Sequence, residues 1–167
     1  YMPSVRIQKD MKSGIYFITL TVKNWYYIFD RHNRWEIFRK SLLFCSKKKN
    51  LKIHAWVFMI NHIHLIVRNS DISGFVRDFK KHTSREIMKN IKATEPSVVK
   101  LFEDEGGKFS VWQKTNMPKI IQNESYFWQK KSYIEKNPVR RKYITAPENW
   151  IYSSAFLPAL LPLQSTL

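Results

Sequence analysis

Two histidines separated by a single residue, His62 and His64, could bind one metal ion. They stand at the start of an apolar run, residues 63–68, whose composition predicts a β-strand. Because side chains of a strand alternate between its two faces, both imidazoles would point to the same side of a sheet. Histidines at this spacing are also common as ordinary surface or core residues, so the pair alone does not establish a metal site.

A second pair of polar residues, Tyr133 and Asn137, lies four positions apart in a segment with helical periodicity. This spacing places both side chains on one face of a helix, one turn apart. A tyrosine beside an amide oxygen fits a nucleophile next to a metal ligand. The structural alternative is that Tyr133 packs its ring on the core and Asn137 caps the helix before Pro138.

The elements that would position these groups follow from the hydrophobic pattern. Residues 15–22 predict a strand that is apolar on both faces and therefore central in a sheet. Residues 34–49 predict a crossover helix. The apolar segments 51–60 and 63–68 are so close that they predict an antiparallel hairpin with Asn61 in its turn.

The second half of the chain predicts two more helices around a variable region. The expected elements are a helix over 71–92 capped by Asn69 or Ser70, a mobile loop over 93–108, a short strand over 109–113, and a helix over 124–137 that is capped by Asn123 and stopped by Pro138. The resulting order is β-α-β-β-α-β followed by a helix, which indicates an α+β fold.

The chain is strongly basic. It has 29 Lys and Arg against 13 Asp and Glu, a net charge of +16 at pH 7. An excess of this size predicts an anionic partner, with nucleic acid first. The basic side chains gather on the polar face of the 71–92 helix and at the end of the 34–49 helix; the predicted DNA-binding residues are Arg77, Lys81, Arg85, Lys89, Lys47, Lys48 and Lys49. The alternative is that these are solvated helix faces.

Several classes of function are disfavoured. The four glycines cannot form a phosphate-binding loop, which argues against a nucleotide cofactor. The single cysteine, Cys45, can form neither an internal disulfide nor a thiolate metal cluster. The longest apolar run, residues 56–60, is far below the roughly 18 residues that cross a bilayer. We therefore expect a cytoplasmic protein without a membrane partner.

Four motifs together give a more specific interpretation. The hairpin, residues 55–67, reads AWVFMINHIHLIV; later segments read VWQ (111–113), YIEKNPVR (133–140) and PENWIYSS (147–154). In this order they resemble the single-tyrosine HUH transposases, especially the REP-associated tyrosine transposases, from about Gly14 to Phe156. Two departures are Ile60, where the family usually has proline, and residues 114–118, which lack a family pattern rich in aromatic residues.

The resemblance implies a ferredoxin-like α+β sandwich with a central antiparallel sheet, the histidine pair on a central strand and the tyrosine on a C-terminal helix. The order of elements read above agrees with this fold. We expect a basic lead-in over residues 1–13, a transposase domain over 14–156 and an apolar tail over 157–167 that packs on the body of the protein or on a partner. The implied setting is the bacterial cytoplasm, in association with the nucleoid.

The resemblance also implies a mechanism. His62, His64 and Asn137 would hold one divalent ion, Mg²⁺ or Mn²⁺, and Tyr133 would attack a phosphate of single-stranded or hairpin DNA. The product would be a 5′-phosphotyrosine, and the reverse step would rejoin strands without a nucleotide cofactor. A homodimer is compatible with the resemblance, in which case the tyrosine could serve either subunit.

Two alternatives to this mechanism are open at the level of the sequence. The first is a non-catalytic module that binds single-stranded nucleic acid on the same fold, in which Tyr133 is structural. The second is an enzyme with a carboxylate-only site. It would need separated acidic residues, whereas the only acidic cluster, residues 103–105, lies in an expected loop.

Overall fold

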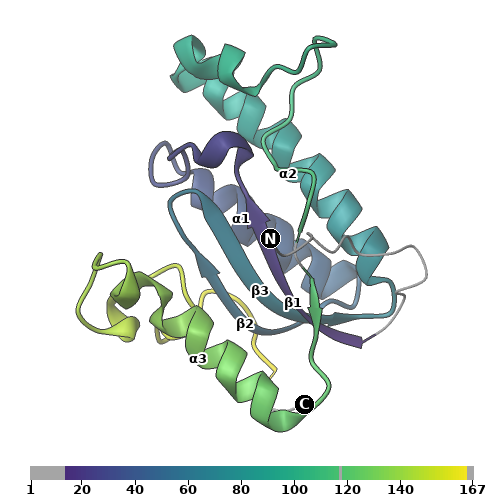
Figure 1. Cartoon of the computed structure of the whole chain (residues 1–167), viewed down its shortest axis with the longest axis vertical. Coiled ribbons are helices and arrows are strands. Elements are labelled where there is room, and N and C mark those ends of the chain that lie inside the picture. The colour runs from purple at the N-terminus through teal and green to yellow at the C-terminus, as the bar shows by residue number, and fades with distance from the viewer. Residues whose placement is uncertain (1–13, 117, 165–167) are drawn as a thin grey trace, which may run out of the picture.

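The computed structural model describes residues 14–116 and 118–164 of the chain. Within them, four strands form one antiparallel sheet in the spatial order β2-β3-β1-β4 (Figure 1). The strands are β1 (Gly14–Thr21), β2 (Lys52–Phe58), β3 (His62–Asn69) and β4 (Lys119–Ile120). The helices are α1 (Arg34–Lys48), α2 (Ile72–Thr94) and α3 (Glu124–Arg140), with short 3-10 helices at Lys23–Trp25, Pro96–Phe102 and Pro147–Asn149. This arrangement confirms the predicted α+β fold.

The topology is that of the ferredoxin-like sandwich. Strands β1 and β2 lie on either side of β3 and each is antiparallel to it, so β1 and β2 run parallel and α1 is the crossover between them. Strand β4 adds to the other edge of β1. The β2-β3 connection is the tight hairpin predicted around Asn61.

Both faces of the sheet are covered, by different helices (Figure 1). Helices α1 and α2 cover one face, where Ile18 of β1 belongs to the same buried cluster as Phe38 of α1. Helix α3 covers the other face, where Phe17 belongs to the same cluster as Ile134. Because neighbouring residues of β1 serve opposite cores, the strand is apolar on both faces, as its sequence predicted.

The helix caps agree with the sequence at one helix and differ at another. Asn123 caps α3, and its side chain accepts a hydrogen bond from a backbone N–H of the first turn at 2.8 Å. The prediction that Asn69 or Ser70 caps α2 is wrong, because Asp71 accepts from the backbone N–H of Gly74 at 2.9 Å. Asn69 instead accepts from the backbone N–H of Asp71 at 2.9 Å and fixes the turn before the helix.

The sequence predicted that Pro138 stops helix α3. The helix instead continues through Pro138 to Arg140. Proline has no N–H to donate to the carbonyl of Ile134, so the helix loses one internal hydrogen bond. The ring of Pro138 is buried, which offsets part of this cost. The side chain of Arg140 folds back and donates to the carbonyl of Tyr133 at 2.8 Å.

The edge of the sheet also differs from the prediction. Residues 109–113 do not form a strand; Trp112 makes only an isolated antiparallel bridge with Val22. The edge strand is β4, further along the chain. Pro118, immediately before β4, has no backbone N–H to donate to β1.

The region expected to be a mobile loop, residues 93–108, is partly helical. Helix α2 extends to Thr94, and Pro96–Phe102 forms a 3-10 helix. The side chain of Phe102 is buried and its ring lies 5.7 Å from that of Tyr26, between centroids. This apolar anchor, which the sequence analysis did not weigh, orders the first half of the segment.

Part of the expected apolar tail packs on the body of the protein. Leu161 is buried, and the backbone N–H of Gln164 donates to the carbonyl of Ile53 at 2.8 Å. The expected basic lead-in, residues 1–13, lies outside the described residues, as do the last three residues of the tail. No helix in the described part of the chain is long and apolar enough to span a membrane.

The buried hydrogen bond from the indole N–H of Trp112 to the hydroxyl of Thr83, 2.9 Å, links residue 112 to α2. We expect Thr83→Val, which keeps the shape of the side chain, to lower the free energy of unfolding by about 1–3 kcal/mol because it strands a buried donor. Urea unfolding measures this loss. The same exchange at exposed Thr145 should cost less than about 0.5 kcal/mol, and equal effects at the two sites would contradict the assigned role of the bond.

Candidate active site

The histidine pair lies on the face of the sheet that α3 covers. His62 and His64 pair across the sheet with Thr21 and Thr19 of β1, and their side chains are 5% exposed each. Their ring centroids are 4.8 Å apart. The two-residue period of β3 therefore brings both imidazoles together, as the sequence predicted for the strand.

One ring nitrogen of each histidine is held by a neighbouring side chain. The Nδ1 atom of His64 is hydrogen-bonded to the hydroxyl of Thr19 at 2.8 Å, and the Nδ1 atom of His62 donates to the side-chain carbonyl of Asn61 at 2.7 Å. The Nε2 atom of His64 is buried and has no hydrogen-bond partner among the described residues. A buried imidazole that is oriented through Nδ1 and free at Nε2 has the arrangement of a metal ligand.

Burial also keeps the two imidazoles neutral. It lowers the pKa of His62 to about 4, with a further contribution from the positive charge of Arg141. Burial lowers the pKa of His64 well below its ordinary value, and the charges of His62, Arg140 and Lys130 act in the same direction. Both rings are therefore unprotonated at pH 7, which is the form that binds a cation.

Helix α3 places Tyr133 against the histidine pair. Its ring meets those of His64 and Phe17 edge to face, with centroids 5.4 and 5.9 Å apart, and the residue is 36% exposed. The guanidinium carbon of Arg140 lies 4.0 Å from the centre of this ring and the Nζ atom of Lys130 lies 5.5 Å from it. A tyrosine that is open to solvent and flanked by two cations is suited to meet a phosphate.

Asn137 lies one turn after Tyr133 on the buried side of α3. It is 4% exposed, and Ile134 of the same helix packs in the cluster that covers the sheet on this face. In the part of the chain that is described, no three His, Cys, Asp or Glu side chains gather as a metal site. A third ligand beside the two imidazoles would therefore be of another type, and the amide oxygen of Asn137 is a hard donor that suits a small divalent ion.

The acidic cluster that a carboxylate-only active site would need lies away from the two histidines. Glu103, Asp104 and Glu105 are exposed, and Asp104 forms an ion pair with Lys23 at 2.6 Å. These acidic residues lie in a solvated turn that is joined to the segment after β1 by this ion pair, and they do not converge as metal ligands would.

The motif PENWIYSS, for which the sequence analysis offered no role, clamps α3 to the sheet. The hydroxyl of Ser154 accepts from the backbone N–H of Trp56 in β2 at 3.2 Å and donates to Glu135 of α3 at 2.9 Å. The indole N–H of Trp150 donates to the carbonyl of Phe58 at 2.9 Å. The motif thus fixes the distance between the helix that carries Tyr133 and the strands beside the histidines.

Sequence reasoning missed four residues at this site. Thr19 and Phe17 come from β1 and act across the sheet, so no local spacing in the sequence marks them. Lys130 and Arg140 lie on α3, and Arg140 belongs to the motif YIEKNPVR. Their spacing from Tyr133 is a signal that could have been used, since residues three and seven positions apart share a helix face.

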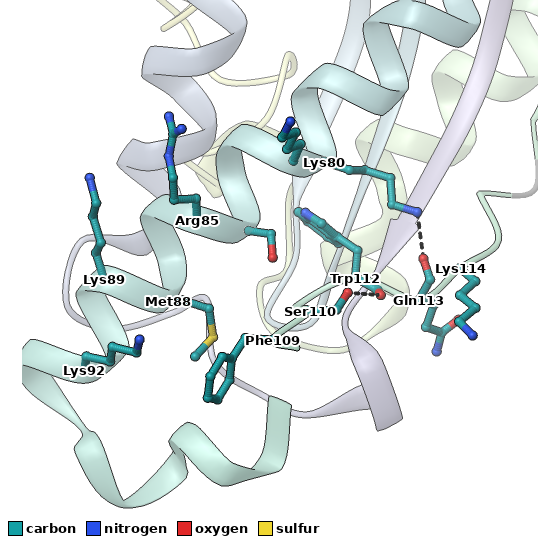
Figure 2. A pocket seen from close by; sticks show the side chains of 12 residues that line it. Lys80, Arg85, Met88, Lys89, Lys92, Phe109, Ser110, Trp112, Gln113 and Lys114 are labelled. Carbon is teal, nitrogen blue, oxygen red and sulfur yellow. Dashed lines mark hydrogen bonds between the residues drawn. The ribbon is translucent and has the colours of Figure 1, made fainter. Parts of the chain in front are cut away.

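The structure separates the predicted DNA-binding residues into groups. Lys81, Arg85 and Lys89 line one cleft beside α2. Figure 2 labels Arg85 and Lys89 in this lining. Arg77 lies on the same helix outside this lining and is paired with Asp78 at 2.9 Å. The exposed lysines at the end of α1, residues 47–49, also lie outside it.

The molecule is thus an α+β sandwich with two buried neutral histidines and a tyrosine on one face, in a strongly basic chain. The sequence model of the family described as "Transposase IS200 like" matches residues 10–137, which include both histidines, Tyr133 and Asn137. The chain belongs to this family of transposases.

One solved structure supports the fold assignment. The structure of a REP-associated tyrosine transposase bound to a REP hairpin superposes with a TM-score of 0.69, at 18% sequence identity, over 99% of this chain and 98% of that one. A second structure, of a candidate transposase from Deinococcus radiodurans R1, gives a TM-score of 0.47 at 16% identity over 81% of this chain and 97% of that one. None of the curated proteins matches the chain.

The low pKa of His62 has a consequence for stability. Between pH 6.5 and about 4, His62 binds a proton in the unfolded chain but not in the folded chain. The free energy of unfolding therefore falls as the pH falls through this window. Above pH 6.5, His62 is neutral in both states and does not change the free energy of unfolding. Urea unfolding of the metal-free protein at several pH values should show a shallower slope for His62→Gln than for the wild type.

Exposed Gln122, whose side chain does not titrate, provides the control, because Gln122→Ala should keep the wild-type slope. The buried His54, whose pKa is lowered in the same direction, contributes equally to all three proteins. A wild-type slope in His62→Gln would show that this imidazole titrates normally in the folded state.

Proposed function

We propose that this protein cleaves and rejoins single-stranded DNA, folded as a hairpin, through a covalent bond between Tyr133 and the 5′ phosphate of the cut strand. The observation that carries the proposal is the contact of Tyr133 with buried His64, whose Nε2 atom has no hydrogen-bond partner among the described residues. Membership of a transposase family supports DNA cleavage, and the similar structure bound to a REP hairpin supports a hairpin substrate.

The donor set fits one divalent ion. His62 and His64 would offer neutral imidazole nitrogens and Asn137 an amide oxygen, a borderline set that accepts Mg²⁺ or Mn²⁺. When bound, such an ion supplies positive charge that stabilises a phosphate under attack. The chain's own contribution is to hold the two imidazoles in place, His64 through Thr19 and His62 through Asn61.

The reaction exchanges one phosphoester bond for another. The phenolic oxygen of Tyr133 forms a bond to phosphorus, the bond to the 3′ oxygen of the neighbouring nucleotide breaks, and that oxygen leaves as a hydroxyl with the proton that the phenol has lost. Because the ester bond is conserved, attack by a 3′-hydroxyl reverses the step without a nucleotide. Lys130 and Arg140, which flank the ring, would bind the phosphate and balance its charge.

The contact between the tyrosine and the histidines lies within one chain. Tyr133 reaches His64 of its own sheet, and the serine clamp that fixes α3 is also internal to the chain. We therefore propose that the site is complete in a single subunit, so that a homodimer is not required for cleavage.

The nucleophile is tested by Tyr133→Phe, which removes the hydroxyl and keeps the ring between Phe17 and Arg140. We expect wild-type protein with Mn²⁺ to form a covalent adduct with a labelled DNA hairpin on a denaturing gel, and Tyr133→Phe to form none. Tyr126→Phe and Tyr143→Phe are matched controls that should keep the adduct. An adduct that maps to a different tyrosine would refute the nucleophile, and tight binding without any adduct would favour the non-catalytic module.

The metal site is tested by His64→Ala. We expect this variant to lose cleavage and to bind Mn²⁺ at least about tenfold more weakly by calorimetry, since one ligand of three is gone. Its affinity for hairpin DNA, measured in EDTA, should stay within about twofold of the wild type, because affinity comes from many phosphate contacts. Preserved cleavage, or unchanged Mn²⁺ binding in a folded variant, would contradict the ligand assignment.

A further inference from the structure

A cleft of about 560 Å³ lies between α2 and residues 109–114 (Figure 2). Among the described residues that line it, none is acidic and six are cationic: Lys80, Lys81, Arg85, Lys89, Lys92 and Lys114. Helix α2 packs on the opposite face of the sheet from α3, so this cleft is separate from the candidate active site.

One of these cations, Lys80, fastens the wall of the cleft. Lys80 donates to the backbone carbonyl of Gln113 at 2.7 Å and to the side chain of Asn116 at 2.9 Å. Arg85 and Lys89 both contact Glu86, which is not among the lining residues. Like charges that line one cleft repel each other, and an anionic ligand would relieve that repulsion.

The cleft also contains an exposed aromatic ring. Phe109 is 39% exposed, and the Nζ atom of Lys92 lies 5.0 Å from the centre of its ring. The segment that carries it is held in place, since the backbone N–H of Val111 donates to the hydroxyl of Ser84 at 3.2 Å. A simple anion needs no aromatic surface, whereas a nucleotide needs both a ring for its base and cations for its phosphate.

The wall of the cleft continues toward the candidate active site. Residues 111–116 run along the edge of β1, where the N–H of Gln113 donates to the carbonyl of Thr21 at 2.8 Å and the N–H of Thr19 donates to that of Asn116 at 3.1 Å. Thr19 is the residue that orients His64. A cation also stands beside the tyrosine itself, since the Nζ atom of Lys130 lies 5.5 Å from the centre of the Tyr133 ring.

We propose that this cleft binds unpaired nucleotides of the DNA strand that leads to Tyr133, with a base stacked on Phe109 and phosphates held by Arg85, Lys89, Lys92 and Lys114. The inference rests on the proposed function for the identity of the strand as DNA. It adds a second contact region, on the other side of the sheet edge from the reacting tyrosine.

The stacking contact is tested by equilibrium binding in EDTA, so that no cleavage takes place. The probes are a blunt DNA hairpin and the same hairpin with a short unpaired extension. Wild-type protein should bind the extended hairpin more tightly, and Phe109→Ala should lose about tenfold in affinity for it while binding the blunt hairpin as before. Phe109→Trp should retain the gain, and Phe44→Ala, which removes an exposed ring on α1, should also retain it.

The phosphate contacts are tested by salt titration of the extended hairpin. Lys92→Gln should reduce the slope of log affinity against log salt by about 0.7, the value for one contact with a single strand. Lys100→Gln, an exposed lysine outside the cleft, should leave the slope unchanged.

Two outcomes overturn the inference: no gain from the extension in the wild type, or an unchanged gain in Phe109→Ala. An RNA extension that binds more tightly than the DNA extension would overturn the assignment to DNA. Failure of the proposed function has a different signature, namely no covalent adduct from wild-type protein whatever the extension contributes to binding.

Discussion

The burial of two adjacent neutral imidazoles under α3 is the constraint on which the candidate site depends. Protonation of either ring would place a charge in a dry environment near the positive charge of Arg141, and the lowered pKa of each histidine expresses that cost. The rings can be buried because the β1-β3 register brings Thr19 to one Nδ1 atom and the hairpin turn brings Asn61 to the other. The strand β1 and the β2-β3 hairpin turn thus supply the two partners.

The position of Tyr133 depends in turn on how α3 is held. The helix packs its apolar side on the sheet through residues such as Ile134, and Ser154 bridges the backbone of β2 and Glu135. The family match ends at Asn137, before this clamp begins. Precise placement of the tyrosine therefore relies on a segment outside the matched region, and a change near Ser154 would alter the site without touching a catalytic group.

Much of this arrangement could be predicted because it follows from local periods. The spacing of His62 and His64 defines a strand face, that of Tyr133 and Asn137 defines a helix face, and the doubly apolar β1 defines a central strand. The contributions of Thr19 and Phe17 could not be predicted in this way, because cross-strand register is set by the whole sheet. The cap at Asp71 and the continuation of α3 past Pro138 depend on tertiary contacts that compete with local preference.

The separation of the basic cleft from Tyr133 by the edge of the sheet has a mechanical consequence. A strand that occupies both places must turn sharply around residues 111–116, over a distance much shorter than the roughly 150 base pairs across which duplex DNA stays straight. An unpaired strand bends at each nucleotide and can follow this path, whereas a double helix cannot. The path between the two places would thus exclude a continuous duplex by its stiffness alone, with no contact that reads a base pair, while the stem of a hairpin can lie outside this path.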